Sequence, residues 1–150
     1  MVNDTVPRAA LTEEHLGIWM NFIEKDNTYC KYYDEFVVLL ETGMRVSEFC
    51  GLTQKDLDFK NRRIRVDHQL IRERGGKYYV EETKTSSGRR FLPMNETVYI
   101  SLKKMLERRP TVKAEPMVDG YSGFIMLDKN GNPKVALHLS LIHISEPTRR

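Results

Sequence analysis

Three residues of this chain have the types and the spacing that suit chemistry on a phosphate group. Arg45 and Glu48 stand three positions apart in the run ETGMRVSE (residues 41–48), and Lys84 follows about forty residues later. An arginine can hold a phosphate through two parallel hydrogen bonds, and a lysine on a nearby hairpin can deliver a proton to the same group. Together they predict phosphoryl-transfer chemistry on a nucleic acid, with this chain supplying part of the machinery.

The arginine is expected at the start of a short helix. Residues 29–41 carry apolar side chains at helical spacing, and Gly43 is the left-handed residue expected after the last turn. The backbone reverses there, so Arg45 opens a new helix over residues 45–51. The first N–H groups of a helix have no partner within it and can also face an anion. A surface arginine paired to a nearby glutamate is the alternative interpretation.

The lysine is expected in a turn of a small antiparallel sheet. Apolar and polar residues alternate over residues 64–70, which predicts a half-buried strand. Gly75-Gly76 predicts the first hairpin turn, residues 77–83 the second strand, and residues 89–93 the third. The pattern therefore predicts a three-stranded antiparallel meander with Lys84 near its second turn. A solvated hairpin lysine is the alternative, because Lys77 is also available for the same role.

The fold class predicted from these patterns is α+β, mainly helical around the small sheet. Thr12 is the expected N-cap of a helix ending near Lys25, and Asn95 that of a helix over residues 96–109. Residues 124–127 suggest a short buried strand. The chain then divides into a linker (1–10), one domain (11–136) and a tail (137–150). The tail resembles a translated sequencing adapter from about Leu139 onward and is treated as non-native.

Composition excludes several classes of protein. The chain has 150 residues, 40% of them hydrophobic and 30% charged, which suits one globular domain with a real core. No apolar stretch is long enough to span a membrane, and the N-terminus lacks a signal sequence, so we expect a cytoplasmic protein with no membrane partner. Cys30 and Cys50 predict free thiols, and the four histidines show no metal-binding spacing.

Positive charge is concentrated in one segment. Residues 60–90 carry a surplus of six positive charges, although the whole chain has a net charge of only +3. Such a basic segment predicts contact with a polyanion; a solvated charged sheet face is the alternative. The basic residues expected to contact its phosphates are Arg62, Arg63, Arg65, Lys77, Arg89 and Arg90.

These motifs, in this order, resemble the catalytic domain of the tyrosine recombinases, also called the phage integrase family. The resemblance spans residues 11–135 and includes TGMRVSE (42–48), DLD (56–58), KT (84–85) and RFLP (90–93). Residues 31–34, 67–70 and 132–136 look especially like integrases of conjugative transposons. The sequence is thus expected to form the N-terminal part of such a catalytic domain.

The resemblance assigns roles to three residues. It implies that Arg45 holds the non-bridging oxygens of the scissile phosphate, that Lys84 is the general acid for the departing 5′ oxygen, and that Glu48 orients Arg45 or neighbouring groups. It also implies that the polyanion is double-stranded DNA, and that the reaction has a 3′-phosphotyrosine intermediate and needs no metal or nucleotide cofactor. The full-length protein is expected to self-associate as a tetramer on DNA.

The same resemblance exposes missing groups. The family's His-x-x-Arg box and nucleophilic tyrosine are absent by motif, because all seven tyrosines precede the place where that box should begin. His138 is rejected, since the third residue after it is Leu141. We therefore expect a chain that lacks the nucleophile and is inactive alone. Two alternatives stay open: a DNA-binding module without chemistry that uses the basic hairpin, and a type IB topoisomerase.

Overall fold

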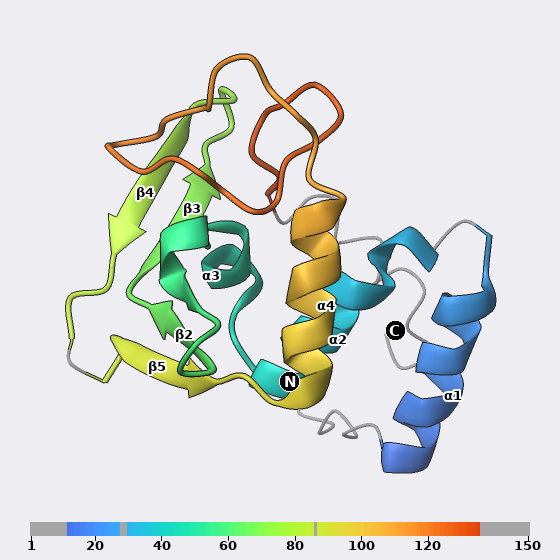
Figure 1. The fold of residues 1–150 in the computed structure, drawn as a ribbon. Coiled ribbons are helices and arrows are strands. Elements are labelled where there is room, and N and C mark those ends of the chain that lie inside the picture. The colour runs from blue at the N-terminus through green and yellow to red at the C-terminus, as the bar shows by residue number, and fades with distance from the viewer. Residues whose placement is uncertain (1–11, 28–29, 86, 136–150) are drawn as a thin grey trace, which may run out of the picture.

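The computed structural model describes residues 12–27, 30–85 and 87–135. Figure 1 shows the longer helices on one side of the molecule and the strands, with a short helix among them, on the other; the segment after the last helix runs back over the strands. In chain order the helices and strands are α1 (Glu13–Lys25), η1 (Cys30–Tyr32), α2 (Tyr33–Thr42), α3 (Val46–Cys50), η2 (Gln54–Asp56), β1 (Leu57–Asp58), β2 (Arg63–Val66), β3 (His68–Arg72), β4 (Tyr78–Glu82), β5 (Arg90–Pro93) and α4 (Glu96–Glu107).

Three capping residues begin or end helices where the sequence predicted them. The Thr12 side chain accepts a hydrogen bond from the His15 N–H (3.0 Å) at the start of α1, and Asn95 does the same for Val98 (2.8 Å) at the start of α4. Gly43 ends α2 with φ 70°, a left-handed conformation that glycine adopts without a steric penalty. The expected helix over residues 29–41 instead begins as the 3₁₀ turn η1 and becomes α-helical at Tyr33, while residues 28–29 lie outside the described part.

The strands form two sheets instead of one meander. One sheet has the antiparallel order β1-β2-β5, and the other is the hairpin β3-β4. The continuous strand predicted over residues 64–70 was wrong, because it is interrupted at Asp67 between β2 and β3. The pairing of the third strand was also wrong, since β5 pairs with β2, with Val66 opposite Arg90. A three-stranded antiparallel sheet is present, but its first strand is Leu57–Asp58.

Residues 124–127, in the segment after α4, are buried without forming a strand. They make only isolated bridges, Thr53 with Phe124 and Leu127 with Pro133. The strand predicted there was therefore wrong, although the burial was anticipated. The proposed linker lies outside the described residues, and so does the tail.

One core joins the helices to both sheets. Phe49, Leu52, Ile64, Leu70, Leu102 and Phe124 are its largest fully buried side chains. They come from α3 and its end, from β2 and β3, from α4 and from the segment after it. Among the described residues, no helix is long and apolar enough to cross a lipid bilayer. The core thus holds α3, the helix that begins after Arg45, firmly against the strands.

Candidate active site

Arg45 lies between two helices that fix its position. Gly43 turns the chain after α2, and Met44 is buried, with only 4% of its surface exposed. Arg45 follows as the N-cap of α3 with extended backbone (φ −69°, ψ 149°), and it is exposed. Within the part of the chain that the structure describes, its guanidinium makes no hydrogen bond or ion pair. Arg45 therefore presents a cation that its neighbours leave available.

Glu48 holds the backbone of that arginine. Its Oε1 accepts a hydrogen bond from the Arg45 N–H at 3.0 Å, which caps the first turn of α3. The carboxylate is nearly buried, with 9% of the side chain exposed. Burial alone would raise the pKa of Glu48, but hydrogen bonds from Arg90 and from the Arg45 N–H, together with the positive charges of both arginines, outweigh it and lower that pKa. Glu48 is therefore a fixed anion beside Arg45.

Arg90 supplies the counter-charge to this glutamate. Its Nη2 lies 2.9 Å from Glu48 Oε1 and its Nη1 lies 3.2 Å from Glu48 Oε2, a two-pronged contact. Sequence reasoning grouped Arg90 with outward-facing DNA contacts. Strand alternation could have indicated otherwise, because Arg90 and Leu92 point to one face of β5 and the exposed Phe91 and Pro93 to the other.

Lys84 stands on the loop that joins β4 to β5. The Thr83 N–H donates to the Asp67 carbonyl (2.9 Å), which anchors the start of this loop. The Gly88 N–H donates to the Thr85 hydroxyl (3.2 Å), which closes its tight turn. Lys84 is exposed, and its ammonium has no hydrogen bond or ion pair among the described residues. It is the second cation left available.

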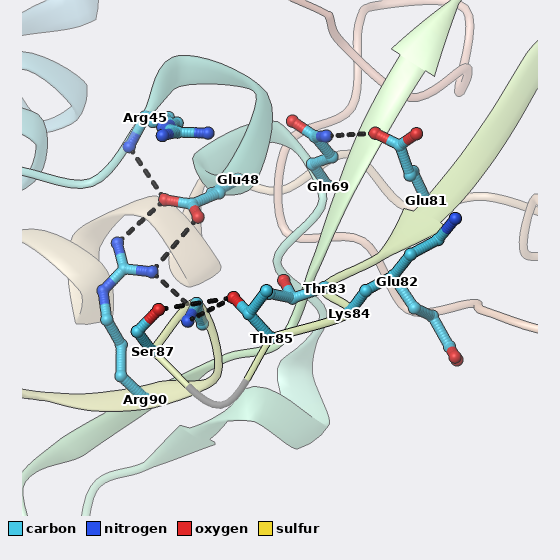
Figure 2. A pocket seen from close by; sticks show the side chains of 11 residues that line it. Arg45, Glu48, Gln69, Glu81, Glu82, Thr83, Lys84, Thr85, Ser87 and Arg90 are labelled. Atoms are coloured by element: carbon cyan, nitrogen blue, oxygen red, sulfur yellow. Dashed lines mark hydrogen bonds and ion pairs between the residues drawn. The ribbon is translucent and has the colours of Figure 1, made fainter.

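A single cavity of about 560 Å³ is lined by Arg45, Glu48, Lys84 and Arg90. Figure 2 shows Arg45, Glu48 and Arg90 on one side of this hollow and Lys84, Glu81 and Glu82 on the other. The structure thus brings together the three residues predicted from the motifs and adds Arg90 to them.

The remaining acids of the cavity wall are engaged with neutral partners. Gln69 accepts a hydrogen bond from the Ser47 hydroxyl (2.6 Å) and donates to Glu81 Oε1, which links α3 to β3 and β4. Glu82 accepts a hydrogen bond from the Tyr121 hydroxyl (2.7 Å). Neither residue forms an ion pair with Arg45 or Lys84 in the described structure. The cavity therefore combines unpaired cations with hydrogen-bonded acids.

The other basic residues predicted to contact DNA lie outside this cavity. Arg62 pairs with Glu96 (3.1 Å) and stacks on the Tyr99 ring. Arg63 pairs with Asp58 (3.4 Å) and covers Phe91. The Arg89 Nε donates to the Thr83 carbonyl, and Lys77 is exposed beside β4. Arg62, Arg63, Arg65, Lys77 and Arg89 are all exposed, and their contact with DNA stays a prediction.

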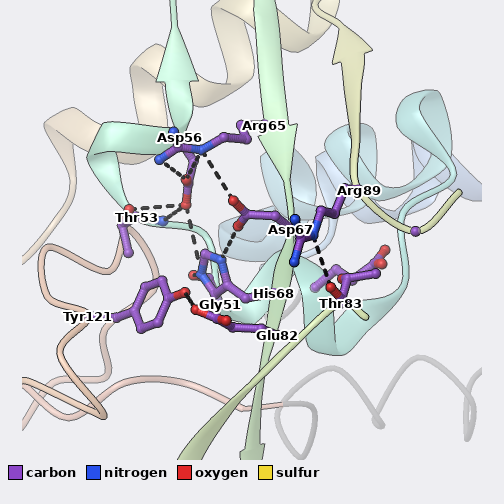
Figure 3. Close-up of polar contacts among 12 residues, drawn as sticks. Gly51, Thr53, Asp56, Arg65, Asp67, His68, Glu82, Thr83, Arg89 and Tyr121 are labelled. Carbon is purple, nitrogen blue, oxygen red and sulfur yellow. Dashed lines mark hydrogen bonds and ion pairs between the residues drawn. The ribbon is translucent and has the colours of Figure 1, made fainter. Parts of the chain in front are cut away.

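Arg65 belongs to a second polar cluster, shown in Figure 3. It contacts Asp56 Oδ1 through Nε (3.1 Å) and Nη2 (3.0 Å), while the backbone N–H and hydroxyl of Thr53 both donate to Asp56 Oδ2. His68 Nδ1 lies 2.7 Å from Asp67 Oδ1, and its Nε2 lies 2.6 Å from the Gly51 carbonyl oxygen.

The carboxylate oxygens and ring nitrogens of this second cluster are atoms of the kind that bind metal ions. Donor atoms of Asp56, Asp67 and His68 lie within 4.8 Å of one another. Each nevertheless has a protein partner already, because Arg65 and Thr53 satisfy Asp56, and the His68 ring lies between Asp67 and Gly51. The arrangement fits an ion-pair and hydrogen-bond network better than a metal centre.

The model of the phage integrase family matches residues 9–142. The chain belongs to the phage integrase family. Its recognition from the TGMRVSE, KT and RFLP motifs is therefore confirmed.

Among curated relatives, the transposase from transposon Tn916 of Enterococcus faecalis is 48% identical over 134 residues. That alignment covers 89% of this chain but 33% of the relative, so the chain spans about a third of the length of the curated relatives it matches. The integrase of Staphylococcus phage L54a is 36% identical over 96 residues, which are 61% of this chain and 27% of that integrase.

Solved structures share the fold. The Tn1549 transposon integrase, in complex with a circular intermediate DNA, has a TM-score of 0.87 and 43% identity, over 95% of this chain and 45% of that one. XerA recombinase has a TM-score of 0.62 at 19% identity, over 95% of this chain and 42% of that one, which shows a shared fold alone. The α+β catalytic-domain fold expected from the sequence is confirmed.

Proposed function

We propose that this chain forms part of the active site of a site-specific DNA recombinase that breaks and rejoins DNA through a 3′-phosphotyrosine intermediate. The observation that supports it most is that Arg45 and Lys84, two cations without ion-pair partners in the described structure, line one cavity. A phosphodiester of duplex DNA supplies the anion that this arrangement lacks.

Each residue has a distinct part in the proposed reaction. The Arg45 guanidinium binds the non-bridging oxygens and stabilises the charge that grows on them in the transition state. Lys84 protonates the 5′ oxygen as the bond to phosphorus breaks. Glu48 touches neither oxygen in this scheme and instead holds the Arg45 backbone. Arg62, Arg63, Lys77 and Arg89 add sequence-independent attraction to the DNA backbone.

The nucleophile must come from residues that these 150 do not supply by motif. In the proposed mechanism a tyrosine hydroxyl attacks the phosphorus, forms the phosphotyrosine ester and expels the 5′ hydroxyl. The ester keeps the energy of the broken bond for rejoining, so no nucleotide cofactor is required. Tetrameric self-association on DNA is proposed for the full-length protein.

The test uses the protein encoded by the complete reading frame that contains this chain. A nicked duplex that traps the covalent protein–DNA complex is incubated with the wild type and with Arg45→Ala, and DNA affinity is measured in parallel. We expect the variant to form the complex about 100- to 1,000-fold more slowly, with most of its affinity retained.

Lys104→Ala, which removes an exposed cation of α4 outside the cavity, serves as the control and should leave the rate unchanged. Normal complex formation by Arg45→Ala would remove Arg45 from the mechanism. A wild-type protein that binds DNA but never forms a covalent complex would instead support the DNA-binding module.

A further inference from the structure

Arg90 joins the two walls of the cavity. We propose that Arg90 is a positioning residue whose guanidinium fastens the Glu48 carboxylate of α3 to the Gly88 carbonyl of the loop that carries Lys84, and so keeps Arg45 free for the phosphate. This inference deepens the proposed function and rests on it for its catalytic consequence. The link from Glu48 through Arg90 to Gly88 is supported by the contacts alone.

The geometry of the contact requires an arginine. Two guanidinium nitrogens reach the two oxygens of Glu48 at 2.9 and 3.2 Å, and Nη1 also donates to the Gly88 carbonyl at 2.9 Å. A planar fork can serve both partners at once, whereas a lysine ammonium is a point charge on a flexible stem. Arg90 is therefore a crosslink between Glu48 of α3 and the Gly88 carbonyl.

The crosslink also acts on Arg45 through Glu48. Glu48 Oε1 accepts from both the Arg45 N–H (3.0 Å) and Arg90 Nη2 (2.9 Å). With Arg90 removed, the carboxylate would lose its fixed rotamer and the cap of α3 would loosen. The Arg45 side chain, which leaves the backbone at the Cα next to that N–H, would then be less firmly oriented.

The charge of Arg90 also affects Arg45. The nearly buried Glu48 carboxylate, three residues along the chain, would be a natural ion-pair partner for Arg45, yet its ion pair is made with Arg90. Arg90 thus neutralises the anion that would otherwise compete with a phosphate for Arg45. The lowered pKa of Glu48, in which the Arg90 hydrogen bond opposes the effect of burial, agrees with this geometry.

The chain contains a matched control. Arg109 makes the same kind of contact, with two nitrogens on Glu115 at 3.0 and 2.6 Å and a third on the Phe124 carbonyl at 2.7 Å. It does not line the cavity. Arg90→Gln and Arg109→Gln therefore remove equivalent contacts at two different places.

The first experiment uses this 150-residue chain and needs no catalysis. NMR of carboxyl-labelled glutamate follows the titration of Glu48, and the amide proton of Arg45 is followed in the same samples. We expect Arg90→Gln to raise the titration midpoint of Glu48 and shift the Arg45 amide, and Arg109→Gln to leave both unchanged. An unchanged Glu48 midpoint in Arg90→Gln would overturn the crosslink.

The second experiment measures catalysis in the protein encoded by the complete reading frame. We expect Arg90→Gln to slow covalent-complex formation about 10- to 100-fold, with DNA affinity within about threefold of wild type, and Arg90→Lys to restore part of the rate. Equal losses of rate and affinity would identify Arg90 as a DNA contact and overturn the proposal.

The two experiments separate the possible failures. If the wild type forms no covalent complex, the proposed function fails while the NMR titration still decides the crosslink. If Arg90→Gln does not fold, Arg90→Lys is used in both experiments, because it keeps the charge and loses the fork. Wild-type behaviour of Arg90→Lys in both would overturn the requirement for a fork.

Discussion

The cavity around Arg45 and the cluster around Asp56 use similar residues in opposite ways. In the cluster, the Arg65 guanidinium contacts Asp56 and Asp67, and His68 is held between Asp67 and Gly51. In the cavity, Glu48 is matched by Arg90, and Arg45 and Lys84 have no ion-pair partner in the described structure. Paired charges thus belong to the scaffold, and unpaired cations indicate where an anion should bind.

The two regions are also connected. Gly51 follows α3, and its carbonyl accepts from His68, while the Asp67 carbonyl accepts the N–H of Thr83 beside Lys84. The cluster therefore supports both the helix that begins at Arg45 and the loop that carries Lys84. We expect changes in the cluster to reduce stability, and changes in the cavity to reduce catalysis.

The largest expected effect concerns Lys84. Lys84→Ala in the protein encoded by the complete reading frame should slow cleavage about 100- to 10,000-fold, because the 5′ oxygen then leaves without a proton. A DNA substrate with sulfur at the 5′ bridging position should restore most of the rate, since a thiolate leaves unprotonated. Arg45→Ala, which acts on the non-bridging oxygens, should gain much less from the sulfur. Equal recovery of both variants would contradict the division of roles.

Breaking the cluster should cost stability. Asp56→Ala removes the acceptor for Thr53 and the partner of Arg65, and we expect a loss of roughly 2–3 kcal/mol in the free energy of unfolding by urea. Asp56 is nearly buried, so water cannot replace the lost contacts. Glu115→Ala, which removes an exposed partner of Arg109, should cost about 1 kcal/mol or less. Similar losses for the two variants would show that the cluster is not part of the scaffold.

A steric change should act at the junction of the two regions. A Cβ on Gly51 would lie 3.0 Å from the Leu70 backbone nitrogen and 3.2 Å from the Gln69 carbonyl carbon. Gly51→Ala should therefore push α3 away from β3 and destabilise the protein by roughly 1–3 kcal/mol. Gly17→Ala in α1 is the control, because nothing lies within 4 Å of its Cβ. An unfolding free energy of Gly51→Ala equal to that of the wild type would show that the neighbouring backbone moves apart without a loss of stability.

The smallest effect is a difference in pH dependence between two buried acids. The pKa of Glu48 is lowered on folding, so its stabilising contribution is present above the ordinary value of 4.5 and is lost as the pH falls through the folded value. The pKa of Glu35 is raised, chiefly by burial, so stability should increase as the pH falls from that raised value towards 4.5. Glu48→Gln and Glu35→Gln should therefore change the pH profile of Tm in opposite directions, and parallel profiles would contradict these assignments.

Short-range features were predictable because their physics is local. Thr12, Gly43 and Asn95 act on backbone groups within four residues, and all three end or begin helices as expected. The spacing of Arg45 and Glu48 likewise follows from one turn of helix. The family resemblance then extended these motifs to Lys84, which lines the same cavity.

Long-range pairing was not predictable in the same way. The pairing of β5 with β2 joins residues more than twenty positions apart, and at the break between β2 and β3 the Asp67 carbonyl accepts the N–H of Thr83, which follows β4. The burial of Asp34 and Glu35 in α2 has no signal in helical periodicity, because Arg108 and Lys134 neutralise them from distant parts of the chain. The contact between Arg90 and Glu48 was not anticipated for the same reason, since Glu48 lies 42 positions earlier.

The central claim is that Arg45 and Lys84 bind one backbone phosphate together. NMR of this chain can follow the Arg45 Nε–H and the Lys84 Cε–H signals while a short DNA duplex is added at two salt concentrations. We predict that both signals shift with the same dissociation constant and that this constant rises steeply with salt. Signals that saturate at different DNA concentrations, or an Arg45 signal that never moves, would contradict the account.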